Sequence, residues 1–467
     1  MNCDRKLSTA RLMLMGVLAT ALLLDPRSGS AWERRVAKTY QVQMLRVDDR
    51  GDLYAAVSLD PLYTNGQTTA LVKLRSRDGA ERWRQIVPTA GPQVDRGAHV
   101  TGIGTQPSGD AVIVSTASNS RGHDVIRFAR HDSRTGRARW RRTVRSDTAD
   151  GYAEAFGAAV DRAGDVVAAG TITRGPAAIR YEAEDLFVVK LSGDDGSELW
   201  RYQLDGGANV GDGANSVAVD SHDDVIVAGG VRTGRNATDG VAFVMKHAAS
   251  TGDVLWRTNL PEGGSVMSIT RADDVILGGR LAVSLVRGNS GEVMWETPFP
   301  AIGNVYDARE LPSGDIVVFG LESYAVEKLF IARLDGTTGA EQWRTAIDDV
   351  FTLGGSLLAV VDPARLVVGG QRTAVPGTCY DAFSAEFDAV SGAPIASQTY
   401  DGTTVALGCE VDCPGEGPGR CTPGYGSDKD ETFAVAAAPN GGIIVAGSLS
   451  DGHLGRPRGF VATIPSP

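Results

Sequence analysis

The chain has 467 residues, 42% of them hydrophobic and 22% charged, which is the composition of an ordinary soluble protein with enough apolar residues for a sizeable core. Its formal net charge of -11 makes nucleic acid and anionic membrane surfaces poor partners. The length alone would suggest several domains, but a phrase that recurs along the chain predicts one repeat domain over residues 32–467.

Residues 1–31 have the pattern of an export signal. Arg5, Lys6 and Arg11 form a basic start, residues 12–24 are apolar, and Gly29-Ser30-Ala31 supplies small residues for cleavage. The apolar run is too short to span a bilayer as a helix. We therefore expect a signal peptide, with an uncleaved anchor as the alternative, and a mature protein in the periplasm or outside the cell that has no membrane span.

From residue 32 onward the chain repeats a glycine that is followed four residues later by tryptophan. The copies are Gly79/Trp83, Gly136/Trp140, Gly196/Trp200, Gly252/Trp256, Gly291/Trp295 and Gly339/Trp343, and with Trp32 they contain all 7 tryptophans of the chain. A large side chain that is confined to one place in a repeat is expected to have a repeated packing role.

Each tryptophan phrase is preceded by a predicted β-hairpin. Residues 215–220 and 224–230, for example, are apolar runs on either side of a turn at 221–223. Corresponding turns occur at 49–52, 107–110, 162–165, 271–274, 312–315, 362–365 and 439–442. A third strand follows each hairpin and a fourth begins near the tryptophan. Each unit is therefore predicted to contain four short antiparallel strands.

The second strand of each hairpin indicates how the units pack. Residues 166–170, 316–320 and 443–447 are continuous apolar runs, whereas a sheet with one wet face would alternate. Sheets that are buried on both faces predict the radially packed blades of an all-β propeller. The last unit lacks a fourth strand, which residues 32–36 can supply. The prediction is an eight-bladed β-propeller closed by the N-terminal strand, with a seven-bladed ring as the alternative.

The Gly-x3-Trp phrase at the end of a four-stranded unit resembles the repeat of the pyrroloquinoline-quinone-like propellers. This family includes quinoprotein dehydrogenases and the propeller subunit of the bacterial outer-membrane β-barrel assembly machinery. The resemblance covers residues 32–467 and implies that the repeated tryptophans dock adjacent blades. It assigns this role to Trp32, Trp83, Trp140, Trp200, Trp256, Trp295 and Trp343. The assembly subunit is typically lipid-anchored through a cysteine directly after the apolar run, and residues 25–31 contain no cysteine here.

Four cysteines follow the expected signal, at Cys379, Cys409, Cys413 and Cys421. An even number in an exported chain predicts two disulfides, for which three pairings are possible. A zinc site is the alternative, but the spacing lacks a Cys-x2-Cys pair. Three of these cysteines fall in a Gly/Pro-rich insertion at about residues 397–431. This insertion is either a loop that the cysteines staple or a binding segment.

The sequence contains no recoverable catalytic set. Its histidines (His99, His123, His131, His222, His247 and His453) lack metal-ligand spacing, and the aspartate pairs at 48–49, 223–224 and 273–274 fall in hairpin turns, where aspartate stabilises the turn itself. We therefore expect no catalytic, cofactor-binding or metal-binding residues.

Two functions are compatible with these features. The favoured hypothesis is a non-catalytic exported propeller, expected to be monomeric, that serves as a binding or scaffold module for a protein or polysaccharide partner. The alternative rests on the family resemblance alone and is an oxidoreductase of alcohols or sugars that uses pyrroloquinoline quinone with Ca²⁺. Dehydrogenases of this kind carry adjacent cysteines that form a disulfide, and no two cysteines are adjacent here.

Overall fold

The computed structural model describes residues 32–59, 68–87, 98–119, 123–148, 151–173, 184–207, 211–234, 240–260, 264–279, 282–299, 304–323, 328–348, 350–351, 357–373, 380–400, 431–438, 442–450 and 457–464. No helix in this part of the chain is long and apolar enough to cross a membrane. The expected signal peptide and the four cysteines Cys379, Cys409, Cys413 and Cys421 lie outside the described residues, so the signal, disulfide and zinc interpretations stay predictions.

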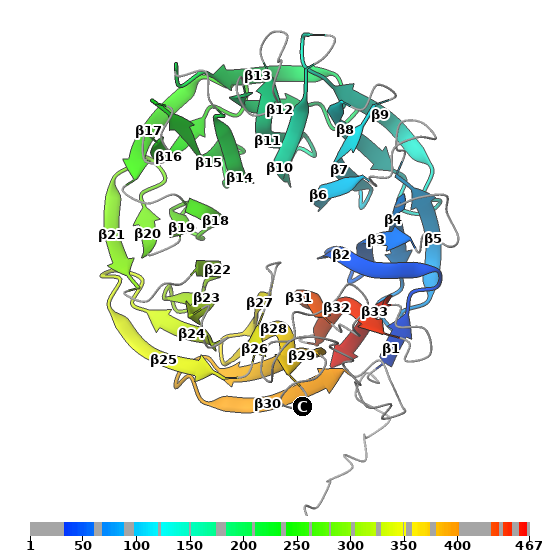
Figure 1. Cartoon of the computed structure of the whole chain (residues 1–467), viewed down its shortest axis with the longest axis vertical. Helices are drawn as coiled ribbons and strands as arrows, with labels where there is room; N and C mark the ends of the chain where they lie inside the picture. Colours follow the sequence, from blue (N-terminus) through cyan, green and yellow to red (C-terminus); the bar gives the residue numbers. More distant parts are fainter. Residues whose placement is uncertain are drawn as a thin grey trace, which may run out of the picture.

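The strands form eight antiparallel sheets arranged as the blades of a ring (Figure 1). The first four blades contain β2 (Thr39–Val47), β3 (Leu53–Leu59), β4 (Thr68–Leu74) and β5 (Glu81–Ile86); β6 (His99–Thr105), β7 (Ala111–Ser118), β8 (Asp124–His131) and β9 (Ala138–Val144); β10 (Ala153–Val160), β11 (Val166–Thr173), β12 (Glu184–Leu191) and β13 (Glu198–Leu204); and β14 (Gly213–Val219), β15 (Val225–Arg232), β16 (Gly240–His247) and β17 (Val254–Leu260).

The other four blades complete the ring. They contain β18 (Gly264–Ile269), β19 (Val275–Gly279), β20 (Ala282–Val286) and β21 (Val293–Pro298); β22 (Asn304–Glu310), β23 (Ile316–Ser323), β24 (Lys328–Leu334) and β25 (Glu341–Ile347); β26 (Val350–Phe351), β27 (Leu358–Asp362), β28 (Arg365–Thr373), β29 (Tyr380–Asp388) and β30 (Pro394–Tyr400); and β31 (Glu431–Ala437), β32 (Ile443–Ser450), β33 (Pro457–Ile464) and β1 (Trp32–Arg35).

The eighth blade is closed by the N-terminal strand, as the sequence predicts. Its strand order is β1-β33-β32-β31, and the β1 to β33 register pairs Trp32 with Thr463 and Arg35 with Phe460. The short fifth unit does not merge with a neighbour but forms its own sheet of β18 to β21. The ring therefore has eight blades rather than seven.

The blades bury both faces of their middle strands. All eight residues of β11 are buried, and one apolar cluster joins Phe128 of the second blade to Val166 and Phe187 of the third. The continuous apolar runs in the sequence are the consequence, because each sheet packs between two others. The hydrophobic core is therefore a chain of inter-blade clusters around the ring.

Each Gly-x3-Trp phrase lies at a joint between blades. The indole nitrogen of Trp83 donates a hydrogen bond to the carbonyl of Ser133, 3.0 Å away in the next blade. Gly136, which ends the same turn, has a φ of 71°, and a Cβ on it would lie 2.7 Å from the Trp83 ring. The same contact recurs between Trp140 and Gly196, Trp200 and Gly252, Trp256 and Gly291, Trp295 and Gly339, and Trp343 and Gly392.

Ala396 occupies the position of the missing tryptophan in the seventh blade. It pairs with Glu386 across β29 and β30, as Trp343 pairs with Arg333 in the sixth blade. The eighth blade takes its third and fourth strands from opposite ends of the chain, so no glycine turn joins them. A tryptophan at residue 396 would lack the glycine turn against which the six tryptophans from Trp83 to Trp343 pack. For Trp32 the structure describes only the backbone pairing in β1 and not the side chain.

Buried ion pairs reinforce the same joints. The ammonium of Lys246, opposite Trp256 in the register, lies 2.6 Å from the Asp220 carboxylate and 3.2 Å from that of Asp224. Lys246 also donates to the carbonyl of Gly288, which accepts the indole N–H of Trp256 as well. The aspartates of the hairpin turns therefore anchor the basic residue that shares an acceptor with the tryptophan.

Candidate functional site

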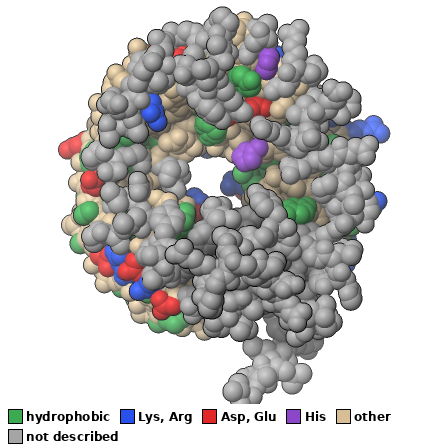
Figure 2. All heavy atoms as spheres, viewed as in Figure 1, with side chains coloured by type: hydrophobic (Ala, Val, Ile, Leu, Met, Phe, Trp, Pro, Cys, Tyr) green, Lys and Arg blue, Asp and Glu red, His purple; other side chains and the backbone are tan. Residues whose placement is uncertain are grey.

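A cavity of about 880 Å³ lies at one end of the central channel, where the hairpin turns between first and second strands gather. Figure 2 shows the opening at the centre of the ring, with Lys and Arg side chains beside it. The ends of the innermost strands β2, β14, β18, β22, β27 and β31 line this cavity. Six different blades therefore contribute to it, and only a closed ring can form it.

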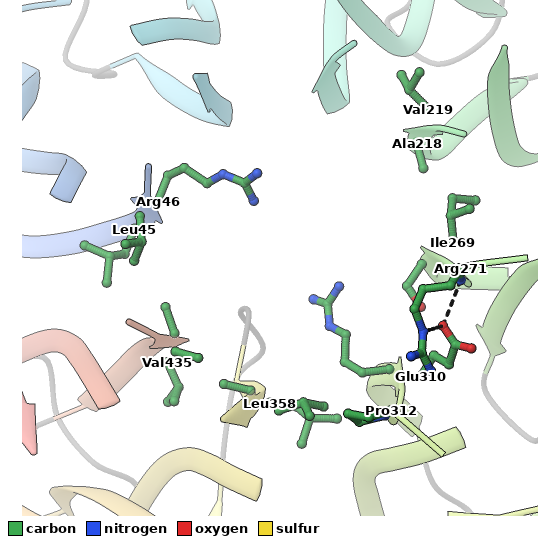
Figure 3. Close-up of a pocket in the computed structure, with 17 residues that line it drawn as sticks. Leu45, Arg46, Ala218, Val219, Ile269, Arg271, Glu310, Pro312, Leu358 and Val435 are labelled. Carbon is green, nitrogen blue, oxygen red and sulfur yellow. Dashed lines mark hydrogen bonds and ion pairs between the residues drawn. The ribbon is translucent and has the colours of Figure 1, made fainter. Parts of the chain in front are cut away.

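Aliphatic side chains form part of the cavity wall. Leu45, Val219, Ile269, Leu358 and Val435 lie around it on separate strands (Figure 3). Such a wall provides contact area for the apolar part of a bound group, while polar groups on the same wall fix its orientation.

Arg46 is a charged residue in the lining of this cavity. Its exposed side chain extends from β2 into the open space (Figure 3). Neither a hydrogen bond nor an ion pair links its guanidinium to another described residue. The guanidinium therefore keeps its donors for a ligand, and its planar fork suits carboxylate and phosphate groups.

Arginine is unusual at this level of the channel. Arg46 pairs with Tyr54 across β2 and β3, and the matching position carries Arg309 in the sixth blade. The other six blades place small residues there, namely Gly104, Ala159, Ala218, Ser268, Ala359 and Ala436. Two blades have thus departed from the repeat by placing a cation where the others leave space.

The second arginine is partly neutralised by its own strand. Arg309 Nε lies 2.9 Å from Asp307 Oδ1, and the Asp307 side chain is buried. Burial raises the pKa of Asp307 above its ordinary value, although the neighbouring Arg309 opposes this shift. Arg309 therefore adds less positive charge to the cavity than Arg46 does.

The carboxylate that lines the cavity is already engaged. Glu310 Oε2 accepts hydrogen bonds from the backbone nitrogen of Arg271 at 2.7 Å and from its Nε at 3.1 Å (Figure 3). Arg271 also donates from Nη2 to the Leu311 carbonyl. This pair links the turns of the fifth and sixth blades and leaves Arg46 as the principal charge in the cavity.

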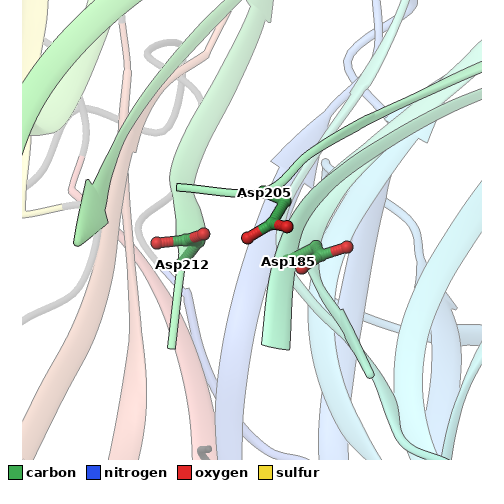
Figure 4. A group of neighbouring side chains, drawn as sticks. All are labelled: Asp185, Asp205 and Asp212. Atoms are coloured by element: carbon green, nitrogen blue, oxygen red, sulfur yellow. The ribbon is translucent and has the colours of Figure 1, made fainter. Parts of the chain in front are cut away.

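Three carboxylates gather elsewhere, at the junction between the third and fourth blades. Oxygen atoms of Asp185, Asp205 and Asp212 lie within 4.8 Å of one another (Figure 4). Asp212 accepts hydrogen bonds from the backbone nitrogens of Gly206 and Arg232. Burial raises the pKa of Asp212, with the charges of Asp185 and Asp205 adding to the effect. Carboxylate oxygens suit a hard cation such as Ca²⁺, but the backbone donors already occupy part of this set.

A serine, a histidine and an aspartate meet between the turns of the fourth and fifth blades. Ser221 Oγ donates to Asp273 Oδ2 at 2.5 Å, and His222 Nδ1 lies 3.2 Å from the same oxygen. In a catalytic triad the histidine uses one ring nitrogen for serine and the other for aspartate. Here the same nitrogen faces both residues, so the contact joins two turns and does not activate the serine.

Comparison with known proteins places the chain in a family. The sequence profile described as outer membrane protein assembly factor BamB matches residues 19–296, which is more than half of the chain. The chain belongs to this family. No curated protein sequence matched the chain.

The fold of this BamB-family chain is also found in solved structures of different function. The quinohemoprotein alcohol dehydrogenase from Comamonas testosteroni is 12% identical with a TM-score of 0.59, over 95% of this chain and 78% of that one. The enzyme ADHIIG from Pseudomonas putida HK5 is 13% identical with a TM-score of 0.57, over 94% and 77%. Saccharomyces cerevisiae Sqt1 is 9% identical with a TM-score of 0.52, over 94% and 99%. These likenesses show the shared propeller fold.

The channel-end cavity does not fit a quinone held by Ca²⁺. Such a group needs several oxygen ligands beside it, and the carboxylate in the cavity lining is the one that Arg271 binds. The cluster of Asp185, Asp205 and Asp212 lies at strand ends opposite to the hairpin turns, away from this cavity. Among the described residues, the cavity that could hold a quinone and the carboxylate cluster that could hold Ca²⁺ therefore lie apart.

The residues that distinguish the cavity were not among those singled out in the sequence. Arg46 and Arg309 lack any motif, and the tryptophan repeat draws attention to the outer strands. An alignment of the eight first strands with one another would have found them, because both arginines stand where the other copies have Gly, Ala or Ser.

Proposed function

We propose that the protein is a non-catalytic propeller that binds a protein or polysaccharide partner and receives an anionic group of that partner at its channel end. Arg46 carries this proposal. It is an arginine with no partner among the described residues, and it projects into a cavity of about 880 Å³ whose wall includes aliphatic side chains. Its planar guanidinium can donate two parallel hydrogen bonds to one carboxylate or phosphate, while the aliphatic side chains beside it contact the apolar part of the same group.

We further propose that the protein acts outside the cytoplasm. Residues 1–31 have the signal-peptide pattern, and the matching family is described as an outer membrane protein assembly factor. N-terminal sequencing of protein recovered from the periplasm and from the medium tests this proposal. A mature chain that begins near residue 32 supports export, and an intact Met1 in the cytoplasm contradicts it.

A site-specific crosslink tests the binding proposal. Ala218 lines the cavity, so a photoreactive p-benzoylphenylalanine at this position reports what enters it in living cells. We expect a discrete adduct that Arg46→Ala abolishes and Arg46→Lys partly retains. Val390 is 67% exposed in a turn of the seventh blade and provides the matched control position. An adduct that is identical at both positions, or that persists in Arg46→Ala, contradicts the proposal.

An assay with purified protein distinguishes the enzymatic alternative from the non-catalytic proposal. The protein is incubated with pyrroloquinoline quinone and Ca²⁺, and absorbance and dye-linked oxidation of alcohols and sugars are recorded. Stoichiometric uptake of the quinone with turnover overturns the non-catalytic proposal. Absence of turnover together with the Arg46-dependent adduct supports it.

A further inference from the structure

The outer strand of the second blade concentrates positive charge in an acidic chain. Arginines occur at residues 134, 137, 139, 141, 142 and 145, within and beside β9, and the side chains of all six are exposed. The whole chain has a formal net charge of -11. We call these six residues the arginine strip. Figure 1 shows β9 on the outer rim of the ring.

Few of these charges are neutralised by neighbours. Arg139 lies 2.6 Å from Asp110, which Arg130 also contacts, and 2.6 Å from Asp132, and the charge of Arg142 acts on the nearby Asp195 carboxylate. Arg142 donates to the carbonyl of Gly196. Among the described residues, none forms an ion pair with Arg134, Arg137 or Arg141. The strip therefore presents a net positive potential to solvent.

Comparison of the blades shows why Arg141 lacks a partner. Arg84, Arg201 and Arg344 occupy the same place one residue after the tryptophan, and each binds a glutamate three residues earlier: Glu81, Glu198 and Glu341, respectively. The second blade has Ala138 at the glutamate position. The pair that three other blades form is absent here, as it is in the fourth blade, where Val254 stands three residues before Arg257.

The need to prevent self-association at a sheet edge does not by itself explain why the strip is positively charged. Charged residues on edge strands prevent self-association, and mixed charges serve this purpose as well as one sign does. The outer strands β5, β13 and β25 carry such mixed Glu and Arg pairs. Because β9 keeps only the positive charges, it is suited to an acidic partner in addition.

An apolar cavity beside the strip indicates the kind of partner. It has a volume of about 70 Å³ and is lined by Val87, Ile113 and Phe128 together with Arg141 and Arg142. A polypeptide can place an apolar side chain there while its carboxylates meet the arginines. A uniformly polar acidic polysaccharide has no group of that kind.

We propose that the arginine strip on β9 is the docking edge for an acidic segment of a partner polypeptide that also carries an apolar side chain. This inference rests on the proposed binding function and names the chemistry of the partner. The strip lies on the outer rim, whereas Arg46 lies at the channel end, so the two sites are tested separately.

A peptide binding assay with the full mature chain tests the proposal. The probe is a short fluorescein-labelled peptide of glutamates around one leucine, followed by fluorescence anisotropy at low and high salt. Binding should weaken with salt. Ala138→Glu supplies the missing partner of Arg141 and should lower the affinity about five-fold or more, and Arg141→Ala with Arg142→Ala roughly ten-fold or more. Glu198→Ala frees the corresponding arginine of the third blade and should leave the affinity unchanged.

Two further peptides and one competitor complete the test. A glutamine version of the peptide should not bind, a version with serine in place of leucine should bind more weakly, and polygalacturonate should compete poorly. Equal binding by Ala138→Glu, or equally strong binding of polygalacturonate, overturns the proposal. If the peptide does not bind but the channel-end crosslink forms, the strip proposal is wrong and the channel proposal stands. If the peptide binds but the crosslink does not form, the channel proposal is wrong and the strip proposal stands.

Discussion

The indole ring of Trp83 occupies the space that a side chain on Gly136 of the next blade would need, since a Cβ there would lie 2.7 Å from the ring. Gly136 also has a φ of 71°, which L-amino acids with side chains adopt at a cost. Two separate constraints therefore require glycine at this joint.

Gly136→Ala should destabilise the protein by roughly 2 to 5 kcal/mol, because the strain of a positive φ and the overpacking against Trp83 add together. Gly314 is the matched control: its φ is 93° and a Cβ there would meet nothing within 4 Å. Gly314→Ala should cost only about 1 to 2 kcal/mol. Denaturant unfolding followed by tryptophan fluorescence measures both, and equal losses would contradict the packing role of the ring.

Two buried histidines should make the fold sensitive to acid. His131 stacks on Trp83 and His247 on Trp200, with ring centroids 6.3 and 6.0 Å apart. Burial lowers the pKa of both below the ordinary 6.5, so the unfolded chain binds protons at a higher pH than the folded chain does. The free energy of unfolding should therefore fall as the pH drops below about 6.5.

The pH profile of His247→Gln isolates this contribution. The difference between wild type and variant should shrink as the pH falls, since only the wild type has the proton to take up. Buried carboxyls act in the opposite direction, because burial raises the pKa of Asp307 and of Glu386, but both proteins share that contribution. Parallel profiles from pH 8 to 5 would show that His247 is not protonated on unfolding.

The buried lysine of the fourth blade should matter more than a surface ion pair. Lys246→Met removes the cation that lies 2.6 Å from Asp220, whose side chain is fully buried. Leaving that carboxylate unpaired should cost about 3 to 5 kcal/mol. Asp220→Asn in the same chain should recover much of the loss. A double-mutant cycle measures the coupling, and additive effects of the two substitutions would contradict it.

The cysteines give a prediction that depends on the sequence alone. Cys379, Cys409, Cys413 and Cys421 should form two disulfides in the exported protein. Intact mass after alkylation under non-reducing conditions should show no modified thiol. Four alkylated cysteines, or one bound zinc ion, would be incompatible with this assignment.

The repeat made most of the fold predictable, because each copy carries the same hairpin and the same Gly-x3-Trp phrase. Closure by residues 32–36 followed from counting strands. The start of the insertion was placed too early: residues 397–400 belong to β30, where Tyr400 pairs with Ala382 and its ring lies 5.4 Å from that of Phe460. The divided first strand of the seventh blade, β26 and β27, was not predicted either, since it depends on pairing with β28.

The candidate sites were harder to predict than the fold. The missing glutamate at Ala138 is visible when the repeats are compared, but its meaning depends on the Arg84, Arg201 and Arg344 pairs that the structure reveals. Residues from six blades line the cavity around Arg46. The sequence of one repeat does not show which residues of the other repeats will lie beside it.

The ladder between β1 and β33 also sets the order in which the ring can form. Seven blades are assembled from neighbouring stretches of chain, but the eighth needs residue 32 to meet residue 463. Contacts over so long a separation form slowly, because the ends of the chain must find each other after the intervening segments have become compact. We therefore expect the strand nearest the N-terminus to gain its partner last and the edge of β33 to be unpaired until then.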